Sequence, residues 1–266
     1  MSRLYLIPDI QDMERMKQLA GEYDCAFEYN DFYAPEVLDD RRKQEEIIEA
    51  YARYRSDFSQ DTMHGAFLDV TIHSSDPLIR EASILRVRQS MEIAKRMGVK
   101  GVVFHTGRLA GFRVAYYLKQ WKEMNARFFR ELAEEFPKQQ IYMENMFDEA
   151  PDVLAELAEE MRETGNFGVC LDYAHAALTN RSGQEWVKTL APYIRHMHIN
   201  DNDLENDLHR PVGTGRIDWQ NFDRLMRENS VRSTVLIEVK GYEAQKNSLE
   251  YMRHLGIYPM QYRGTV

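Results

Sequence analysis

The sequence predicts a single α/β domain, spanning residues 1–266, in which eight parallel strands close into a (β/α)₈ barrel of the TIM type. A chain of 266 residues has the length of one such barrel. Short apolar or β-branched runs alternate with longer amphipathic segments, as expected of parallel strands joined by helical crossovers. The segment after the first strand, Pro8-Asp9-Ile10-Gln11-Asp12, contains no glycine, whereas an open doubly wound sheet usually carries a glycine-rich phosphate loop there.

Eight apolar runs are expected to form the strands of the barrel. They lie near residues 3–8, 25–29, 61–64, 101–105, 140–144, 167–172, 194–199 and 233–239. Residues 77–97 give the clearest helix, with apolar residues at helical spacing and a glycine, Gly98, directly after it. Further helices are expected at 113–136 and at 151–164, the second of which begins with Pro151.

The composition argues against several classes of partner. A net charge of −9 disfavours a general affinity for nucleic acid or for anionic membranes. No apolar run approaches the ~20 residues of a membrane span, and the N-terminus lacks the apolar core of a signal peptide. The two cysteines, Cys25 and Cys170, lie in apolar runs and are expected to be buried free thiols. We therefore expect a cytoplasmic protein, and a homo-oligomer is compatible with the sequence.

Ligand-type side chains stand where six of the predicted strands end. They are His64, His105, Glu144, Asp172, His198 and Glu238. The C-terminal ends of barrel strands open onto one face, where active sites lie, so these six side chains are expected to converge. Three converging carboxylates would repel one another, and a divalent cation would remove that repulsion. The sequence therefore predicts a metal site, and mixed carboxylate and imidazole ligands suit Mn²⁺, Co²⁺, Fe²⁺ or Zn²⁺.

Further candidates lie in the loops beyond the strands. His175 follows Asp172 by three residues, and Asp207 and His209 are two residues apart, with Arg210 next to them. A tight loop, Gly213-Thr-Gly215, follows this segment, and its glycines fit either an ordinary turn or a close approach to a ligand. Strand alternation places His196 on the same face as His198 and one layer deeper in the barrel. Apolar walls of the site are expected from Phe32, Tyr33 and Trp219.

The chain resembles the xylose isomerase-like superfamily of TIM barrels over nearly its whole length. The resemblance rests on six motifs in a fixed order: GVVFHTG, IYMEN, GVCLDYAHA, HMHIND, DLHRPVGTGRIDW and VLIEVKG. This superfamily includes sugar and sugar-phosphate isomerases and epimerases, inosose dehydratases, and abasic-site nucleases of the endonuclease IV type.

The epimerase branch implies one divalent ion held by Glu144, Asp172, His198 and Glu238. In that branch the two glutamates exchange protons with the substrate, while the metal stabilises an enediolate as a Lewis acid. The resemblance also implies that His175 and Arg210 contact substrate oxygens. We therefore expect a metal-dependent isomerase or epimerase of a small sugar, keto-sugar or cyclitol.

Three alternatives stay open at this point. A lyase would form the same enediolate and expel a β-hydroxyl group from an inosose or keto-sugar. The nuclease branch implies three Zn²⁺ ions, with His64, His105, Asp207 and His209 as additional ligands. The opening RLYLIPDIQD lacks the Gly-Ala-His-Val-Ser type of strand found in that branch, and the acidic charge also counts against it. The third alternative is a sugar-binding barrel without catalytic activity, but neither glutamate that would transfer protons is missing.

Overall fold

Eight parallel strands form a closed barrel in the order in which they occur in the chain, so the predicted fold is confirmed. The structure is a computed structural model that describes residues 4–260. The strands are β1 (Leu4–Leu6), β2 (Ala26–Tyr29), β3 (Thr62–His64), β4 (Gly101–His105), β5 (Gln140–Glu144), β6 (Phe167–Asp172), β7 (Ile194–Ile199) and β8 (Val235–Ile237). Pairing of β1 with β8 closes the barrel.

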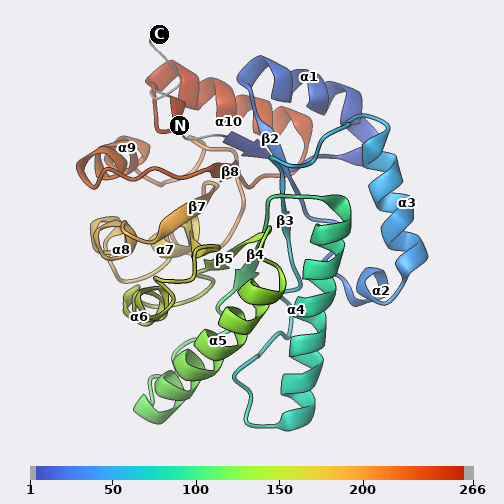
Figure 1. Cartoon of the computed structure of the whole chain (residues 1–266). Helices are drawn as coiled ribbons and strands as arrows, with labels where there is room; N and C mark the ends of the chain where they lie inside the picture. Colours follow the sequence, from blue (N-terminus) through green and yellow to red (C-terminus); the bar gives the residue numbers. More distant parts are fainter. Residues whose placement is uncertain (1–3, 261–266) are drawn as a thin grey trace.

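Helices surround the strands on the outside of the barrel (Figure 1). They are η1 (Ile10–Asp12), α1 (Met13–Tyr23), α2 (Pro35–Leu38), α3 (Arg41–Ala52), α4 (Pro77–Met97), α5 (Ala115–Glu135), α6 (Asp152–Glu160), α7 (Tyr173–Ala177), α8 (Gly183–Leu190), α9 (Trp219–Glu228) and α10 (Tyr242–Leu255). In the part of the chain covered by residues 4–260, no helix has both the length and the apolar character that a membrane span requires.

The clearest predicted helix, α4, has the predicted bounds, and its ends show why. The Asp76 side chain accepts a hydrogen bond from the backbone N–H of Leu78, which caps the helix start. Gly98 follows with a φ of 78°, a left-handed conformation that suits glycine at a helix end. The other two predicted helices are shorter than expected. The backbone of Val114 is extended, which delays the start of α5, and turns replace the last residues of the third helix after Glu160.

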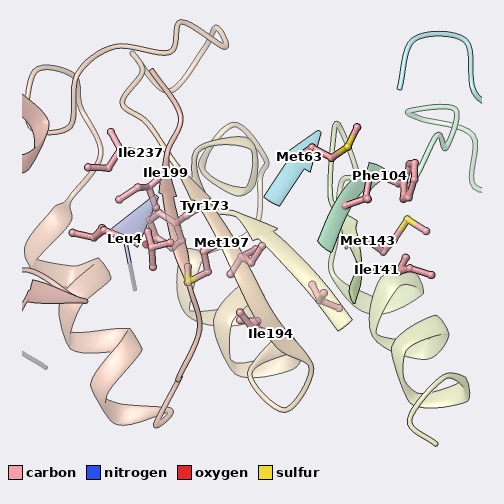
Figure 2. Close-up of a cluster of buried hydrophobic side chains, with 14 of the residues drawn as sticks. Leu4, Met63, Phe104, Ile141, Met143, Tyr173, Ile194, Met197, Ile199 and Ile237 are labelled. Carbon is pink, nitrogen blue, oxygen red and sulfur yellow. The ribbon is translucent and has the colours of Figure 1, made fainter. Parts of the chain in front are cut away.

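Strand alternation separates the two faces of the barrel wall. Met63, Met143 and Met197 belong to the main hydrophobic cluster, which fills the layer between strands and helices (Figure 2). Their chain neighbours His64, Glu144 and His198 therefore point into the barrel. The barrel interior holds two small apolar clusters of its own, Tyr5-Ile7-Ala26-Leu236 and Val103-Tyr142-Cys170. The polar strand-end residues lie above this floor.

Candidate metal centre

Four of the predicted ligands converge at the C-terminal ends of β5 to β8. Each of Glu144, Asp172, His198 and Glu238 offers a ligand atom, and these atoms lie within 4.8 Å of one another. Nδ1 of His198 is 3.4 Å from a carboxylate oxygen of Glu144 and 3.4 Å from one of Glu238. Glu238 stands one residue beyond β8 rather than within it, and its side chain still reaches the group.

Two further groups of ligand-type side chains adjoin this one. His64 and His105 form a group with Glu144, and their Nε2 atoms lie 3.6 and 3.4 Å from the same Glu144 oxygen. His175, Asp207 and His209 form the other group, in which Oδ2 of Asp207 lies 3.4 Å from Nε2 of His175 and 3.2 Å from Nε2 of His209. The structure thus brings together all nine predicted candidate ligands.

The outer ring nitrogens of three imidazoles are already engaged by backbone carbonyls. Nδ1 atoms of His64, His175 and His209 lie 2.9, 3.0 and 2.9 Å from the carbonyl oxygens of Gly65, Asn145 and Glu238. Because a carbonyl oxygen can only accept, each Nδ1 must carry the proton. In the neutral form of each ring, Nε2 then presents a lone pair to the ligand group, and such an outer hydrogen bond is the usual way in which a metal-binding histidine is oriented.

Several buried polar atoms at the centre have no hydrogen-bond partner within residues 4–260. Both carboxylate oxygens of Glu144, and one each of Asp172, Glu238 and Asp207, are buried without such a bond, as are Nδ1 of His198 and Nε2 of His175. Burying polar groups without partners is costly. A divalent cation coordinated by these atoms would satisfy them, so the donor set fits a divalent metal.

Burial and neighbouring charges shift the pKa values of the central carboxyl groups in opposite directions. Burial opposes ionisation of Glu144, but the imidazoles of His198 and His105 outweigh it and hold the pKa of Glu144 well below its usual value. Burial raises the pKa of Asp172 to about 7; the His175 imidazole opposes this rise, and the carboxylates of Glu238 and Glu144 add to it. A bound cation would favour the ionised form of both carboxyl groups.

In the ligand group of His175, Asp207 and His209, the His209 imidazole tends to carry a proton. Burial lowers the pKa of His209, but the carboxylates of Asp207 and Glu238 dominate and raise it to about 9. A metal ion bound by Nε2 of His209 must displace that proton. Metal binding at this centre is therefore expected to release protons near neutral pH.

Asn145 holds the ends of two neighbouring strands in register at the centre. Its amide nitrogen donates to the Asp172 carbonyl at 2.9 Å, and its amide oxygen accepts from the Asp172 N–H at 2.9 Å. Its own carbonyl oxygen accepts from His175. The Asp172 carboxylate in turn accepts from the backbone N–H of His175 at 2.7 Å. This set of bonds fixes Asp172 and His175 relative to Glu144, the residue before Asn145.

The buried carboxylate of Asp201 shapes the loop that carries Asp207 and His209. It accepts hydrogen bonds from the backbone N–H groups of Gly213 and Ile217 and from the indole N–H of Trp219. A Cβ atom at Gly215 would lie 2.3 Å from the Asp201 carboxylate and 2.3 Å from the Asn202 carbonyl oxygen. Gly215 of the predicted tight loop is therefore required because the chain at residues 201–202 passes too close for a side chain at this position.

A cavity of about 600 Å³ opens above the metal centre. Its lining residues are Ile7, Asn30, Tyr33, His64, Phe67, His105, Met146, His175, Asp207, Leu208, His209, Glu238 and Lys240. This volume falls within the range of small-molecule sites, roughly 300–1,000 Å³. The cavity wall is apolar on the side of Tyr33 and Phe67, whose rings lie 4.9 Å apart.

Three of the predicted lining or substrate residues lie elsewhere. Phe32 is fully buried in the hydrophobic core, and the buried Trp219 packs there while its indole binds Asp201. Both residues follow polar or extended segments in the sequence, so the path of the loops around them decides whether their side chains reach the hydrophobic core. Arg210 is exposed, and its backbone pairs with Asp201. Lys240, which the sequence does not single out, lines the cavity.

Glu28 is the main residue of the site that sequence patterns miss. It lies in β2, is completely buried, and contacts both His196 and His198. Burial opposes its ionisation, but these two imidazoles hold its pKa below the usual value. A carboxylate among the apolar residues of the segment CAFEY indicates a buried charge that needs a partner. A pattern of ligands at strand ends misses it, because Glu28 does not stand at the end of its strand. His196 is in the deeper layer, as predicted.

Both cysteines are buried, as predicted, and they do not form a disulfide with each other. Cys170 also lies near the centre, because its sulfur and ligand atoms of His196 and His198 are within 4.8 Å of one another. Burial raises the pKa of the Cys170 thiol well above its ordinary value. The thiol form is therefore favoured in the barrel floor, whereas metal binding by cysteine requires the thiolate.

Residues 22–255 match the model of a family described as xylose isomerase-like TIM barrels. An uncharacterised protein of Methanocaldococcus jannaschii is 29% identical over 179 residues, which are 64% of this chain and 68% of that protein. A probable endonuclease 4 of Nitratidesulfovibrio vulgaris is 26% identical over 235 residues, which are 78% of this chain and 82% of that protein.

Solved structures share the fold at low sequence identity. A protein from Thermus thermophilus, soaked with ZnCl₂, has a TM-score of 0.74 and 21% identity, with 96% of this chain and 98% of that chain covered. A D-tagatose 3-epimerase-like protein has a TM-score of 0.73 and 21% identity, with 94% of this chain and 96% of that chain covered. Identities at this level establish the common barrel architecture.

Proposed function

The chain belongs to the family of xylose isomerase-like TIM barrels, and we propose that it is a divalent-metal-dependent isomerase or epimerase of a small sugar, keto-sugar or cyclitol. One observation carries this proposal. Glu238 lines the small-molecule cavity and also shares a ligand group with Glu144. Two carboxylates beside one metal site can remove and return a proton on the same substrate. The likeness to a D-tagatose 3-epimerase-like fold supports this choice.

The two glutamates would have different positions relative to the substrate. The Glu238 side chain is 12% exposed at the cavity wall, whereas that of Glu144 is 1% exposed beneath it. Glu238 is therefore the carboxylate with the more open path to a carbon-bound proton, and Glu144 would exchange the proton from below. A divalent ion bound by these residues would supply Lewis-acid stabilisation of the negative charge that develops next to the carbonyl group.

Other residues of the cavity would bind and orient the substrate. His175 lines the cavity and would contact substrate oxygens or a second ion. Tyr33 and Phe67 would exclude water on one side, which strengthens electrostatic interactions within the site. Lys240 is the only lysine or arginine among the described residues that line the cavity. The proposed substrate is therefore an uncharged polyol with a carbonyl group rather than a heavily charged molecule.

Proton exchange in heavy water tests the proposal. The Mn²⁺- or Co²⁺-loaded protein is incubated in D₂O with a panel of ketoses, inososes and 3-keto sugars, and deuterium at the carbon next to the carbonyl is followed by NMR. Glu144→Gln and Glu238→Gln are each expected to lose turnover by at least 10²-fold, because positioned acid–base catalysis typically contributes 10²–10⁴-fold. Glu205→Gln, an exposed residue of the neighbouring loop, is the matched control and should retain activity.

The product spectrum separates isomerase from lyase. An isomerase or epimerase returns the proton and yields a substrate isomer, whereas a lyase loses water from the same intermediate. If neither deuterium incorporation nor dehydration occurs with any member of the panel, the proposed reaction is wrong for these substrates. Near wild-type turnover in either Gln variant would exclude the roles given to the two glutamates even if an isomer is formed.

A second candidate function has its own observation in the three adjoining ligand groups. Nine ligand-type side chains in three groups could hold more than one ion, and multinuclear sites are suited to phosphodiester hydrolysis. The likeness to a probable endonuclease 4 supports this candidate, while the net charge of −9 does not favour DNA binding. Incubation of Zn²⁺-loaded protein with a duplex containing an abasic site decides the matter. Incision that Glu144→Gln abolishes would replace the isomerase proposal with this one.

A further inference from the structure

A buried carboxylate lies beneath the metal centre, in the middle of the barrel. Glu28 of β2 has no solvent exposure and points into a barrel interior that also holds Tyr5, Val103 and Leu236. Interiors of such barrels are usually filled by branched apolar side chains. A buried carboxylate is costly unless it is paired, so the partners of Glu28 indicate what it does.

Each oxygen of Glu28 has a different neighbour. Oε2 accepts a hydrogen bond from the Thr62 hydroxyl at 2.7 Å and lies 3.1 Å from Nε2 of His196. Oε1 lies 3.0 Å from Nε2 of His198. Both atoms are buried and form no hydrogen bond with any described residue, so their approach at 3.0 Å is a close ion-pair contact. The contact between them is therefore the one available to both atoms.

The opposite side of the His198 ring faces the metal centre. Its Nδ1 lies 3.4 Å from Glu144 and 3.4 Å from Glu238. A neutral imidazole has one N–H, and a carboxylate only accepts hydrogen bonds. With the proton on Nε2, facing Glu28, the Nδ1 lone pair is free for a metal. With the proton on Nδ1, facing Glu144 and Glu238, the ring cannot bind a metal at that atom.

We propose that Glu28 is a positioning residue that selects the tautomer of His198 in which Nδ1 binds the metal. The other three imidazoles with a fixed outer nitrogen use backbone carbonyls and present Nε2. His198 is turned the other way, and a side chain from β2 supplies the acceptor. This inference rests on the proposed metal centre. Without Glu28, the carboxylates that remain near His198, those of Glu144 and Glu238, lie on its Nδ1 side, so the proton would be drawn to the atom that the metal needs.

Removing the carboxylate tests this role without adding a charge or a donor. In Glu28→Leu, Zn²⁺ affinity at His198 is expected to fall by roughly 10–100-fold, the usual effect of losing a carboxylate that orients a metal-binding histidine. Thr62→Val is the matched control, because it removes a donor to Glu28 but leaves the Oε1 contact with His198. It should retain affinity close to that of the wild type. Affinity is measured in Zn²⁺ buffered with a competing chelator, with ¹⁵N signals of the histidine rings as the site-specific readout.

The ring signals of the wild-type protein provide a test that needs no folded variant at position 28. In the Zn²⁺-loaded protein, His198, identified by loss of its signals in His198→Gln, should be protonated at Nε2 and metal-bound at Nδ1. The opposite pattern would overturn the proposal, as would unchanged Zn²⁺ affinity in Glu28→Leu or an equal loss in Thr62→Val. Failure of the wild-type protein to bind Zn²⁺ would instead refute the metal centre and the proposed function together.

Discussion

Removal of the metal is expected to make the stability of the protein fall as pH rises, and the pKa of Asp172 gives the magnitude of this fall. Burial and two neighbouring carboxylates raise the pKa of Asp172 from 3.8 to about 7 in the metal-free protein. The folded state therefore binds this proton more tightly than the unfolded state, and stability falls as pH rises from about 4 to 7. The difference is roughly three pH units at about 1.4 kcal/mol each, or about 4 kcal/mol in total.

About half of this loss falls in a window that is convenient to measure. Between pH 5.5 and 8.5 the free energy of unfolding of the metal-free protein should fall by about 2 kcal/mol through Asp172, which corresponds to roughly 4–8 °C in Tm for a domain of this size. His209 acts in the same direction, because its pKa is raised to about 9 and its stabilising proton is lost as pH rises through that value. A bound cation keeps Asp172 ionised and takes the place of the proton on His209, so metal-loaded protein should not show this decline.

Thermal unfolding of chelator-treated and Zn²⁺-loaded protein across this window measures the effect. The gap in Tm between the two forms should widen as pH rises, and Asp172→Asn should flatten the decline of the metal-free form. The comparison with Asp172→Asn is decisive, because burial lowers the pKa of His73 to about 4 and therefore makes stability rise with pH in the lower part of this window. The same dependence of Tm on pH in the wild type and in Asp172→Asn would refute the reasoning, because the titrating group would then lie elsewhere.

Three further results are expected. Gly215→Ala should lower the free energy of unfolding by about 1–3 kcal/mol, because its Cβ would meet the Asp201 carboxylate at 2.3 Å. Gly21→Ala in α1, where a Cβ would have nothing within 4 Å, should raise the free energy of unfolding by about 0.5–1 kcal/mol. Equal effects of the two substitutions would contradict the packing argument. Trp121→Phe should cost about 1–3 kcal/mol in urea unfolding, because it leaves the buried Thr106 carbonyl without the indole donor now 2.8 Å away; an unchanged midpoint would show that this bond adds nothing. Elemental analysis after reconstitution and gel filtration should find one to three ions per chain, and a value near zero would rule out the metal centre.

Much of the fold followed from local patterns. The eight apolar runs became the eight strands because each is short, apolar and bounded by turns, and α4 kept its predicted bounds because Asp76 and Gly98 cap it locally. Boundaries shifted where no local signal fixed them. Glu238 was expected at the end of a strand but follows β8, since pairing with β1 and β7 stops at Ile237.

The candidate ligands were also accessible from the sequence, because parallel strands bring their C-terminal ends to one face. Knowing where a strand ends is then enough to place His64, Glu144 or Asp172 at that face. Phe32 and Trp219 could not be placed in this way. They follow strands or loops whose path is set by packing, and both turned inward to the core.

The sequence alone determined which carboxylates and imidazoles lie at the same end of the barrel. The tertiary structure decided which of their side-chain atoms are in contact. Strand ends identify a ring of carboxylates and imidazoles because barrel closure is a property of the whole strand pattern. The partition into three ligand groups, the exposure of Glu238 to the cavity and the contact of Glu28 with His198 depend on barrel stagger and side-chain rotamers. Residues 28 and 198 are far apart in the chain, and only the closed barrel brings their side-chain atoms to 3.0 Å.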